Sequence, residues 1–197
     1  HEVLAADLSD AAARDAVEER LRRPGSPVDV LVNNAGIGTT GTFWTTDPAA
    51  AQVQYDLGVT TVFRLTRAAL EGMVERDRGT IINVASFGAL MPGSNGAAYT
   101  AAKSYVVALS ERIAAELKGA GVSITVLCPG WTRTELHERG GVPTPDPGSA
   151  MWLDADDVVA RAMSDVARGR TRSIPGLRYR LLLGMSEILP RAVTRRG

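Results

Sequence analysis

The chain has 197 residues, 45% hydrophobic and 22% charged, a composition typical of one globular domain with a substantial buried core. Because 22 Lys and Arg residues balance 22 Asp and Glu residues, no overall charge attracts nucleic acid, and we expect no such partner. No apolar run approaches the ~18 residues of a membrane span. The single cysteine, Cys128, excludes an internal disulfide and a cysteine-based zinc site, so we expect no metal and a cytoplasmic location.

Short apolar runs alternate with helix-length segments along the chain. The runs predict buried strands at residues 2–7, 28–36, 79–86 and 121–130, with a possible short strand at 172–176. Helical patterns occupy residues 10–22, 47–77 (where we expect two helices), 97–118 and 154–169. Apolar strands separated by helices predict an α/β fold, a doubly wound parallel sheet covered on both faces, in a single domain over residues 1–197.

Two segments near the C-terminus depart from this alternation. Residues 137–152 contain three prolines and three glycines, so we interpret residues 134–153 as a mobile, irregular substrate lid. Residues 177–190 predict an amphipathic helix broken near Pro190. We prefer subunit or core packing to a membrane-surface role for its apolar face.

Polar residues and glycines end the first four predicted strands. They are Asp7, Asn33 to Gly36, Ser86, and Pro129 with Gly130. In open parallel sheets, ligands bind beyond the carboxyl ends of the strands. The sequence therefore predicts a ligand site built from these residues.

The stretch "AAYTAAK" at residues 97–103 places Tyr99 four residues before Lys103 among helix-forming alanines. Residues four apart share one face of a helix, so the phenol and the amine are expected to lie together. A cation within about 4 to 6 Å favours the phenolate, which suits proton transfer. The alternative is a surface helix whose tyrosine packs and whose lysine is solvated.

Three motifs, in register with the predicted strands, resemble those of the short-chain dehydrogenase/reductase superfamily. "NNAG" at 33–36, Ser86 with "YTAAK" at 99–103, and "PGWTRT" at 129–134 are similar to N-N-A-G, S-x12-Y-x3-K and P-G-x-x-x-T. The resemblance covers essentially the whole chain. It implies a Rossmann-like fold and an NAD- or NADP-dependent oxidoreductase that moves a hydride between nicotinamide and a carbonyl or secondary alcohol substrate, commonly as a homodimer or homotetramer.

The resemblance also implies catalytic roles for three residues. Tyr99 would be the general acid in carbonyl reduction and the base in alcohol oxidation. Lys103 would lower the pKa of Tyr99 and hold the nicotinamide ribose hydroxyls. Ser86 would bind the substrate oxygen, although a serine after a strand can also cap the following turn.

Further residues are assigned to the cofactor by the same resemblance. Asp7 would contact adenine, although an aspartate between a strand and a helix is as naturally a cap. Asn33, Ala35 and Gly36 would lie beside the adenosine ribose and the nicotinamide. The full set of cofactor-binding residues implied is Asp7, Asn33, Ala35, Gly36, Tyr99, Lys103, Pro129, Gly130, Thr132 and Thr134, the two threonines near the carboxamide.

The chain departs from the family in two places. The glycine-rich T-G-x-x-x-G-x-G turn, which receives the pyrophosphate, is absent, and "GIGTTG" at 36–41 follows a later strand. This corresponds to two strand–helix units, roughly 50 residues, that are absent or not represented, and we expect the chain alone to bind dinucleotide weakly or not at all. Gly58 occupies the position of the family's proton-relay asparagine, with Asp56 two residues away. A degenerate or truncated, non-catalytic member acting as a binding or scaffold protein is therefore the alternative hypothesis.

Overall fold

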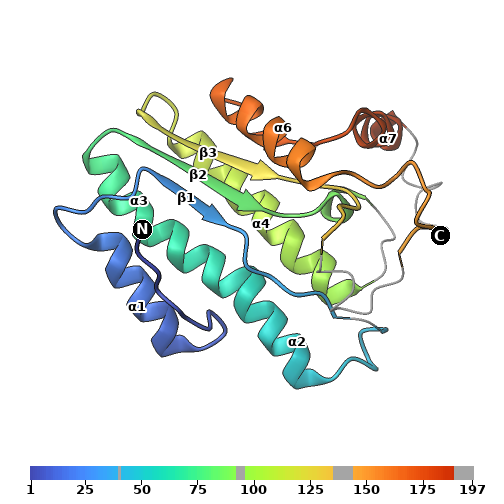
Figure 1. Cartoon of the computed structure of the whole chain (residues 1–197), viewed down its shortest axis with the longest axis horizontal. Helices are drawn as coiled ribbons and strands as arrows, with labels where there is room; N and C mark the ends of the chain where they lie inside the picture. Colours follow the sequence, from blue (N-terminus) through green and yellow to red (C-terminus); the bar gives the residue numbers. More distant parts are fainter. Residues whose placement is uncertain (40, 92–95, 135–143, 189–197) are drawn as a thin grey trace.

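In a computed structural model, which describes residues 1–39, 41–91, 96–134 and 144–188, parallel strands form a sheet flanked by helices (Figure 1). Within these residues the sheet has four strands in the order β1-β2-β3-β4. The strands are β1 (Val30–Asn33), β2 (Gly79–Val84), β3 (Val122–Leu127) and β4 (Arg172–Ser173). Every pairing is parallel, which confirms the predicted α/β class.

The helices follow the predicted segments closely. They are α1 (Ala11–Arg22), α2 (Pro48–Tyr55), the π-helix η1 (Asp56–Thr61), α3 (Val62–Glu75), the 3-10 helix η2 (Phe87–Leu90), α4 (Ala97–Glu116), α6 (Ala155–Ala167) and α7 (Leu177–Ile188). The side chains of Asp10, Asp47 and Asp154 cap the first turns of α1, α2 and α6 by accepting backbone hydrogen bonds. Pro190 lies outside the described residues.

Both faces of the sheet are covered, as Figure 1 shows, with α3 and α4 on one side and α6 on the other. On the first face Met73 of α3 packs with Ile81 and Ile124 of the strands. On the second, Val158 and Ala162 of α6 pack with Ile82 and Leu127. Successive residues of β2, Ile81 and Ile82, therefore enter different clusters, and the prediction of a doubly wound sheet is confirmed.

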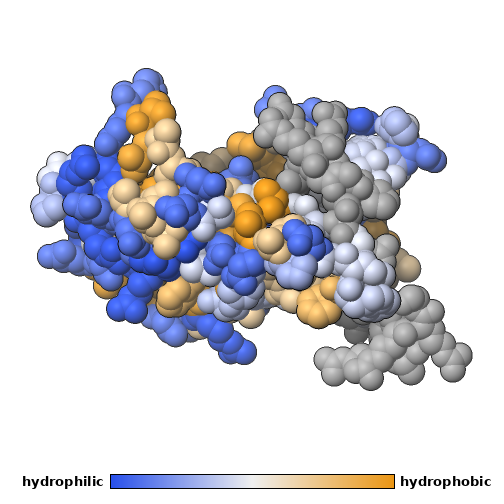
Figure 2. All heavy atoms as spheres, turned by 90° about the horizontal axis from the view of Figure 1, so that it is seen from below, coloured by the Kyte–Doolittle hydropathy of each residue, from blue (hydrophilic) through white to orange (hydrophobic). Residues whose placement is uncertain are grey.

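The prediction of a strand at residues 2–7 is wrong. This segment has no regular structure, and Val3 and Leu4 are exposed. A strand needs a neighbour for its backbone hydrogen bonds, and among the described residues β1 pairs with β2 only. A hollow of about 310 Å³ separates Leu4 and Ala6 from Leu31 and Val32 of β1. Figure 2 shows exposed apolar groups on a mainly hydrophilic face.

Two other expectations need refinement. Residues 47–77 were expected to form two helices, but α2, η1 and α3 follow one another without a break, joined by the π-helical turn. Of the predicted lid, residues 135–143 lie outside the described residues, whereas residues 144–153 are irregular, as expected. Among the helices that the structure describes, none combines the length and apolarity needed to cross a membrane.

Candidate active site

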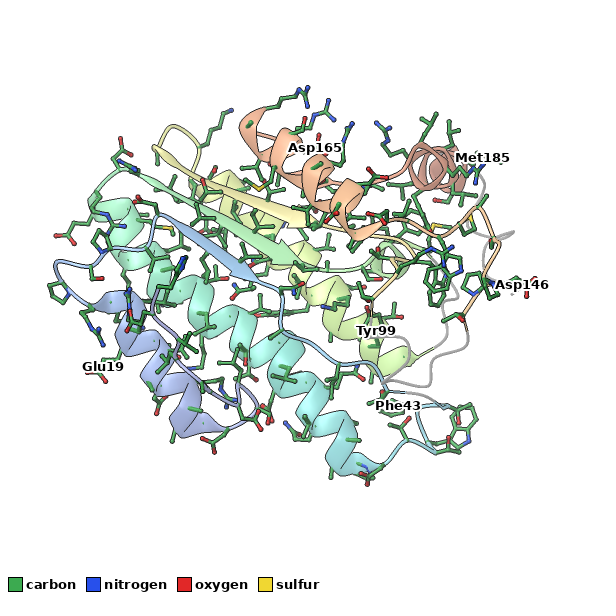
Figure 3. The ribbon with its side chains drawn as sticks, viewed as in Figure 1. Glu19, Phe43, Tyr99, Asp146, Asp165 and Met185 are labelled. Carbon is green, nitrogen blue, oxygen red and sulfur yellow. The ribbon has the colours of Figure 1, made fainter. Side chains whose placement is uncertain are left out.

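The candidate site lies beyond the carboxyl ends of β1, β2 and β3, where α4 begins. Figure 3 labels Tyr99 near this end of α4. Ser86 follows β2, and the next amide, Phe87 N, donates a hydrogen bond of 2.8 Å to Pro129 O after β3. The structure therefore brings the Ser86 and Pro129 segments together, as strand order alone predicts.

The hydroxyl groups of Ser86 and Tyr99 form a side-chain hydrogen bond. Ser86 also accepts a 3.2 Å bond from Gly88 N, so the capping role and the site role coexist. Burial raises the pKa of Tyr99, and the Ser86 hydrogen bond only partly opposes this. The expected lowering of the Tyr99 pKa by Lys103 is therefore wrong as a net effect, because desolvation of the buried phenol dominates, although Lys103 Nζ lies 5.9 Å from the centre of the Tyr99 ring.

Lys103 is a buried cation, with 8% of its surface exposed. Its Nζ donates a 2.8 Å hydrogen bond to Val84 O at the end of β2. A Cβ built on Gly36 would lie 3.6 Å from this Nζ and would contact it. Glycine at this position therefore leaves the space next to the amine free of a side chain. Burial lowers the pKa of Lys103 to about 8.

A buried amide network connects the strand ends to α4. Asn33 Nδ2 donates to Thr66 Oγ1 at 3.1 Å and to Asn83 Oδ1 at 2.8 Å. Asn83 Nδ2 in turn donates to Ser110 Oγ at 3.0 Å, and Ser110 lies on the helix that carries Tyr99 and Lys103. The sequence analysis missed Asn83 and Ser110, although an asparagine inside an apolar strand must find buried partners.

The remaining "NNAG" and "PGWTRT" residues lie around the same end of the sheet. Asn34 and Ala35 are exposed and line the hollow beside β1, together with Asn33. Thr132 is buried and donates its hydroxyl to Gly130 O at 3.0 Å, whereas Thr134 is exposed. Their assignment to a cofactor remains a prediction.

Asp7 forms a local turn before α1. Its carboxylate accepts hydrogen bonds of 2.9 Å from Ser9 N and 2.7 Å from Ser9 Oγ. These bonds lower the pKa of Asp7. The turn-forming role is therefore present, and contact with adenine remains a prediction.

Gly58 lies in the π-helical turn η1, where it packs against α4. A Cβ built on Gly58 would meet the Ala102 side chain at 3.4 Å. Asp56 does not replace the missing amide, because its carboxylate accepts from Gln52 Nε2 at 3.2 Å and Thr60 Oγ1 at 3.3 Å within the helix. A π-helical turn of this kind is frequent at functional sites.

Replacing Lys103 with Met should change how stability depends on pH. The pKa of Lys103 is about 8 in the folded protein against 10.5 ordinarily, so between these pH values the unfolded chain binds more protons and the free energy of unfolding rises with pH. The free energy of unfolding of Lys103→Met minus that of wild type should therefore fall by up to about 3 kcal/mol as the pH rises from 7 to 10.5. Urea unfolding at both pH values measures this difference.

The exposed Lys118 supplies the matched control. Lys118→Met should leave the difference from wild type constant with pH. Burial raises the pKa of Cys128 to about 12, which acts in the opposite direction. This contribution cancels between wild type and Lys118→Met, whereas Lys103→Met also removes the lysine charge that partly lowers the Cys128 pKa. Parallel curves for Lys103→Met and Lys118→Met would contradict a desolvated lysine.

Comparison with known proteins identifies the family of the chain. The family model described as "short chain dehydrogenase" matches residues 1–141. The "Inactive 2-(S)-hydroxypropyl-CoM dehydrogenase 2" of Xanthobacter autotrophicus is 42% identical over 125 residues, 64% of this chain and 54% of the relative. The "D-beta-hydroxybutyrate dehydrogenase" of Cupriavidus necator is 35% identical over 134 residues, 68% of this chain and 52% of the relative.

A solved structure shares the fold over nearly the whole chain. The short-chain dehydrogenase from Sphingobium yanoikuyae in complex with NADPH is 29% identical, with a TM-score of 0.82. The similarity covers 97% of this chain and 77% of that one. By contrast, the chain spans about half the length of the curated relatives it matches.

Proposed function

Because this chain belongs to the short-chain dehydrogenase family, we propose that it transfers a hydride between NAD or NADP and a carbonyl or secondary alcohol substrate. The observation that carries the proposal is the hydrogen bond between Ser86 and Tyr99, with a buried lysine one turn further along α4. These groups occupy the end of the sheet where ligands bind to parallel folds. The NADPH bound by the Sphingobium relative supports the choice of cofactor class.

The residues present fit the nicotinamide half of such a cofactor. Lys103 is a buried donor that makes one hydrogen bond within the described part of the chain, to Val84 O, and this bond uses one of its three protons. The absence of a side chain at Gly36 keeps the surroundings of the amine open. We assign Lys103 and the backbone of Ala35 and Gly36 to the ribose, and Thr132 to the carboxamide. When bound, the nicotinamide supplies or accepts the hydride.

The chain's own residues handle the substrate oxygen and its proton. Ser86 donates a hydrogen bond to the carbonyl oxygen, and Tyr99 gives the same oxygen its proton as negative charge develops there. The raised pKa of Tyr99 keeps this phenol protonated at neutral pH, which is the form that a general acid needs. We therefore propose carbonyl reduction as the favoured direction near neutral pH.

A turnover assay tests the function directly. NADH or NADPH should be consumed in the presence of one or more members of a panel of ketones and should persist without them. Cofactor that binds but is not consumed with any ketone of the panel, in a protein shown by circular dichroism to be folded, would contradict the proposal.

Gly58 favours a second candidate, a non-catalytic member that binds ligand without turnover. The residue leaves no side-chain amide in η1, and one relative carries the word "inactive" in its name. Cofactor binding without consumption across the whole panel would favour this candidate.

We also propose a homodimer or homotetramer built on the helices α3 and α4. Phe63 on α3 and Tyr105 on α4 are large, exposed rings, and Tyr55 is exposed at the end of α2. Exposed aromatic side chains are enriched at subunit contacts. Light scattering, which measures the mass in solution, would disprove this assembly by finding a monomer.

A further inference from the structure

Tyr179 is the buried residue among residues 177–186, the part of α7 whose side chains the structure describes. Only 2% of its surface is exposed, whereas Leu177, Leu181 and Met185 of the same helix are exposed. A helix on the surface that buries a single tyrosine ring holds that ring for a packing or hydrogen-bonding reason. Tyr179 was not among the residues that the motifs singled out.

The Tyr179 ring fills the space between two segments of the active site. It meets the ring of Phe87, the residue after Ser86, edge-on with 4.8 Å between the ring centres. On the other side it lies over Gly130, where an added Cβ would be 1.9 Å from Tyr179 Cζ. The ring therefore contacts both the Ser86 segment and the Pro129–Gly130 motif.

The Tyr179 hydroxyl joins the two ends of the loop over residues 131–153. It accepts a 2.9 Å hydrogen bond from Trp131 N and donates one of 2.6 Å to Met151 O. Two backbone bonds close the same base, from Leu153 N to Trp131 O at 2.7 Å and from Arg133 N to Leu153 O at 3.0 Å. The rings of Trp131 and Trp152 lie edge to face just beyond, 6.1 Å between centres.

We propose that Tyr179 is a positioning residue, which clasps the base of the 131–153 loop through its hydroxyl and holds it against the segment that carries Ser86. The loop base then presents Trp131 and Trp152 as a fixed aromatic wall beside the substrate site. The catalytic meaning of this clasp rests on the proposed function, whereas the clasp itself depends only on the contacts of Tyr179. Burial also raises the pKa of Tyr179, which keeps its hydroxyl able to donate.

The variant Tyr179→Phe separates the hydroxyl from the ring. It keeps the packing on Phe87 and Gly130 and removes both hydrogen bonds at the loop base. We expect amide hydrogen exchange at Trp131, Arg133 and Leu153 to become at least about tenfold faster, with no change in β3. Tyr105→Phe, at an exposed tyrosine on α4, should leave all of these amides unchanged.

Three exchange results would overturn the proposal. One is unchanged exchange at the loop base in Tyr179→Phe, and another is equal acceleration in β3, which would indicate general loosening. The third result needs the wild-type protein alone and therefore does not depend on whether the variants fold. A Trp131 amide that exchanges at the rate of an unprotected amide would show that its hydrogen bond to Tyr179 does not persist in solution.

Steady-state kinetics provide the readout that loss of stability alone would not give. In an assay with an accepted ketone, Tyr179→Phe should raise the KM for the ketone about fivefold or more and leave the KM for the cofactor unchanged. Equal KM values for the ketone in the variant and wild type would overturn the positioning role. If wild type turns over no ketone, the proposed function fails, and the exchange experiment still decides whether the clasp exists.

Discussion

Tyr99→Phe should lower the rate of ketone reduction by about 100- to 10,000-fold, the range that general acid catalysis contributes. The substitution removes the one proton that we assign to the substrate oxygen, and it deletes the hydrogen bond with Ser86. The ring and its place at the start of α4 remain, so cofactor affinity and the unfolding midpoint should change little. Stopped-flow or steady-state consumption of the reduced cofactor measures the loss.

Tyr105→Phe is the matched control for this experiment, because Tyr105 lies on the same helix and is exposed. It should keep wild-type turnover. Residual activity of Tyr99→Phe above about one hundredth of wild type would be incompatible with Tyr99 as the general acid. A collapse of the unfolding midpoint would instead assign a structural role to the phenol.

Gly130→Ala should destabilise the protein by about 1 to 3 kcal/mol or more, because overpacking forces rigid groups apart. The new Cβ would lie 1.9 Å from Cζ of Tyr179 and 2.3 Å from each of two neighbouring ring carbons. The Tyr179 ring contacts Phe87 and its hydroxyl makes two hydrogen bonds, so the ring cannot move away from the new Cβ without losing these contacts. Urea unfolding of both proteins measures the effect.

Gly148→Ala is the control, because a Cβ there meets nothing within 4 Å. It should be close to neutral. If Gly130→Ala were as stable as Gly148→Ala, the close packing of Tyr179 on the Pro129–Gly130 motif would not exist in solution. In the double variant Gly130→Ala, Tyr179→Ala, the clash is removed, so the two substitutions should not be additive.

The residues near the carboxyl ends of the strands could be predicted because parallel topology brings these ends together. Ser86 and Tyr99 are 13 positions apart, yet they hydrogen-bond, as the spacing of the motif implied. The strand at residues 2–7 could not be judged in this way. An apolar run indicates a strand only if a neighbour supplies backbone partners, and composition contains no information about that neighbour.

The pKa shifts of the site residues could not be predicted from the sequence either. Spacing placed Lys103 near Tyr99, but the sign of the Tyr99 pKa shift depends on how much water remains around the phenol. The clasp by Tyr179 joins residues that lie 28 and 48 positions away in the chain. Its one sequence signal is Gly130, three residues beyond the end of β3, because a glycine near a strand often marks a close approach by another group.

Within the part of the chain that the structure describes, β1 pairs along one edge only, and its other edge has a consequence for the behaviour of the chain in solution. Val30 and Val32 are 51% and 52% exposed along this edge, beside the apolar hollow. Edges of this kind act as templates on which further sheets grow, and proteins normally blunt them with charges or prolines. The formal net charge of +0 at pH 7 adds no repulsion between molecules. The colloidal stability of the purified chain therefore depends on whatever covers these two valines.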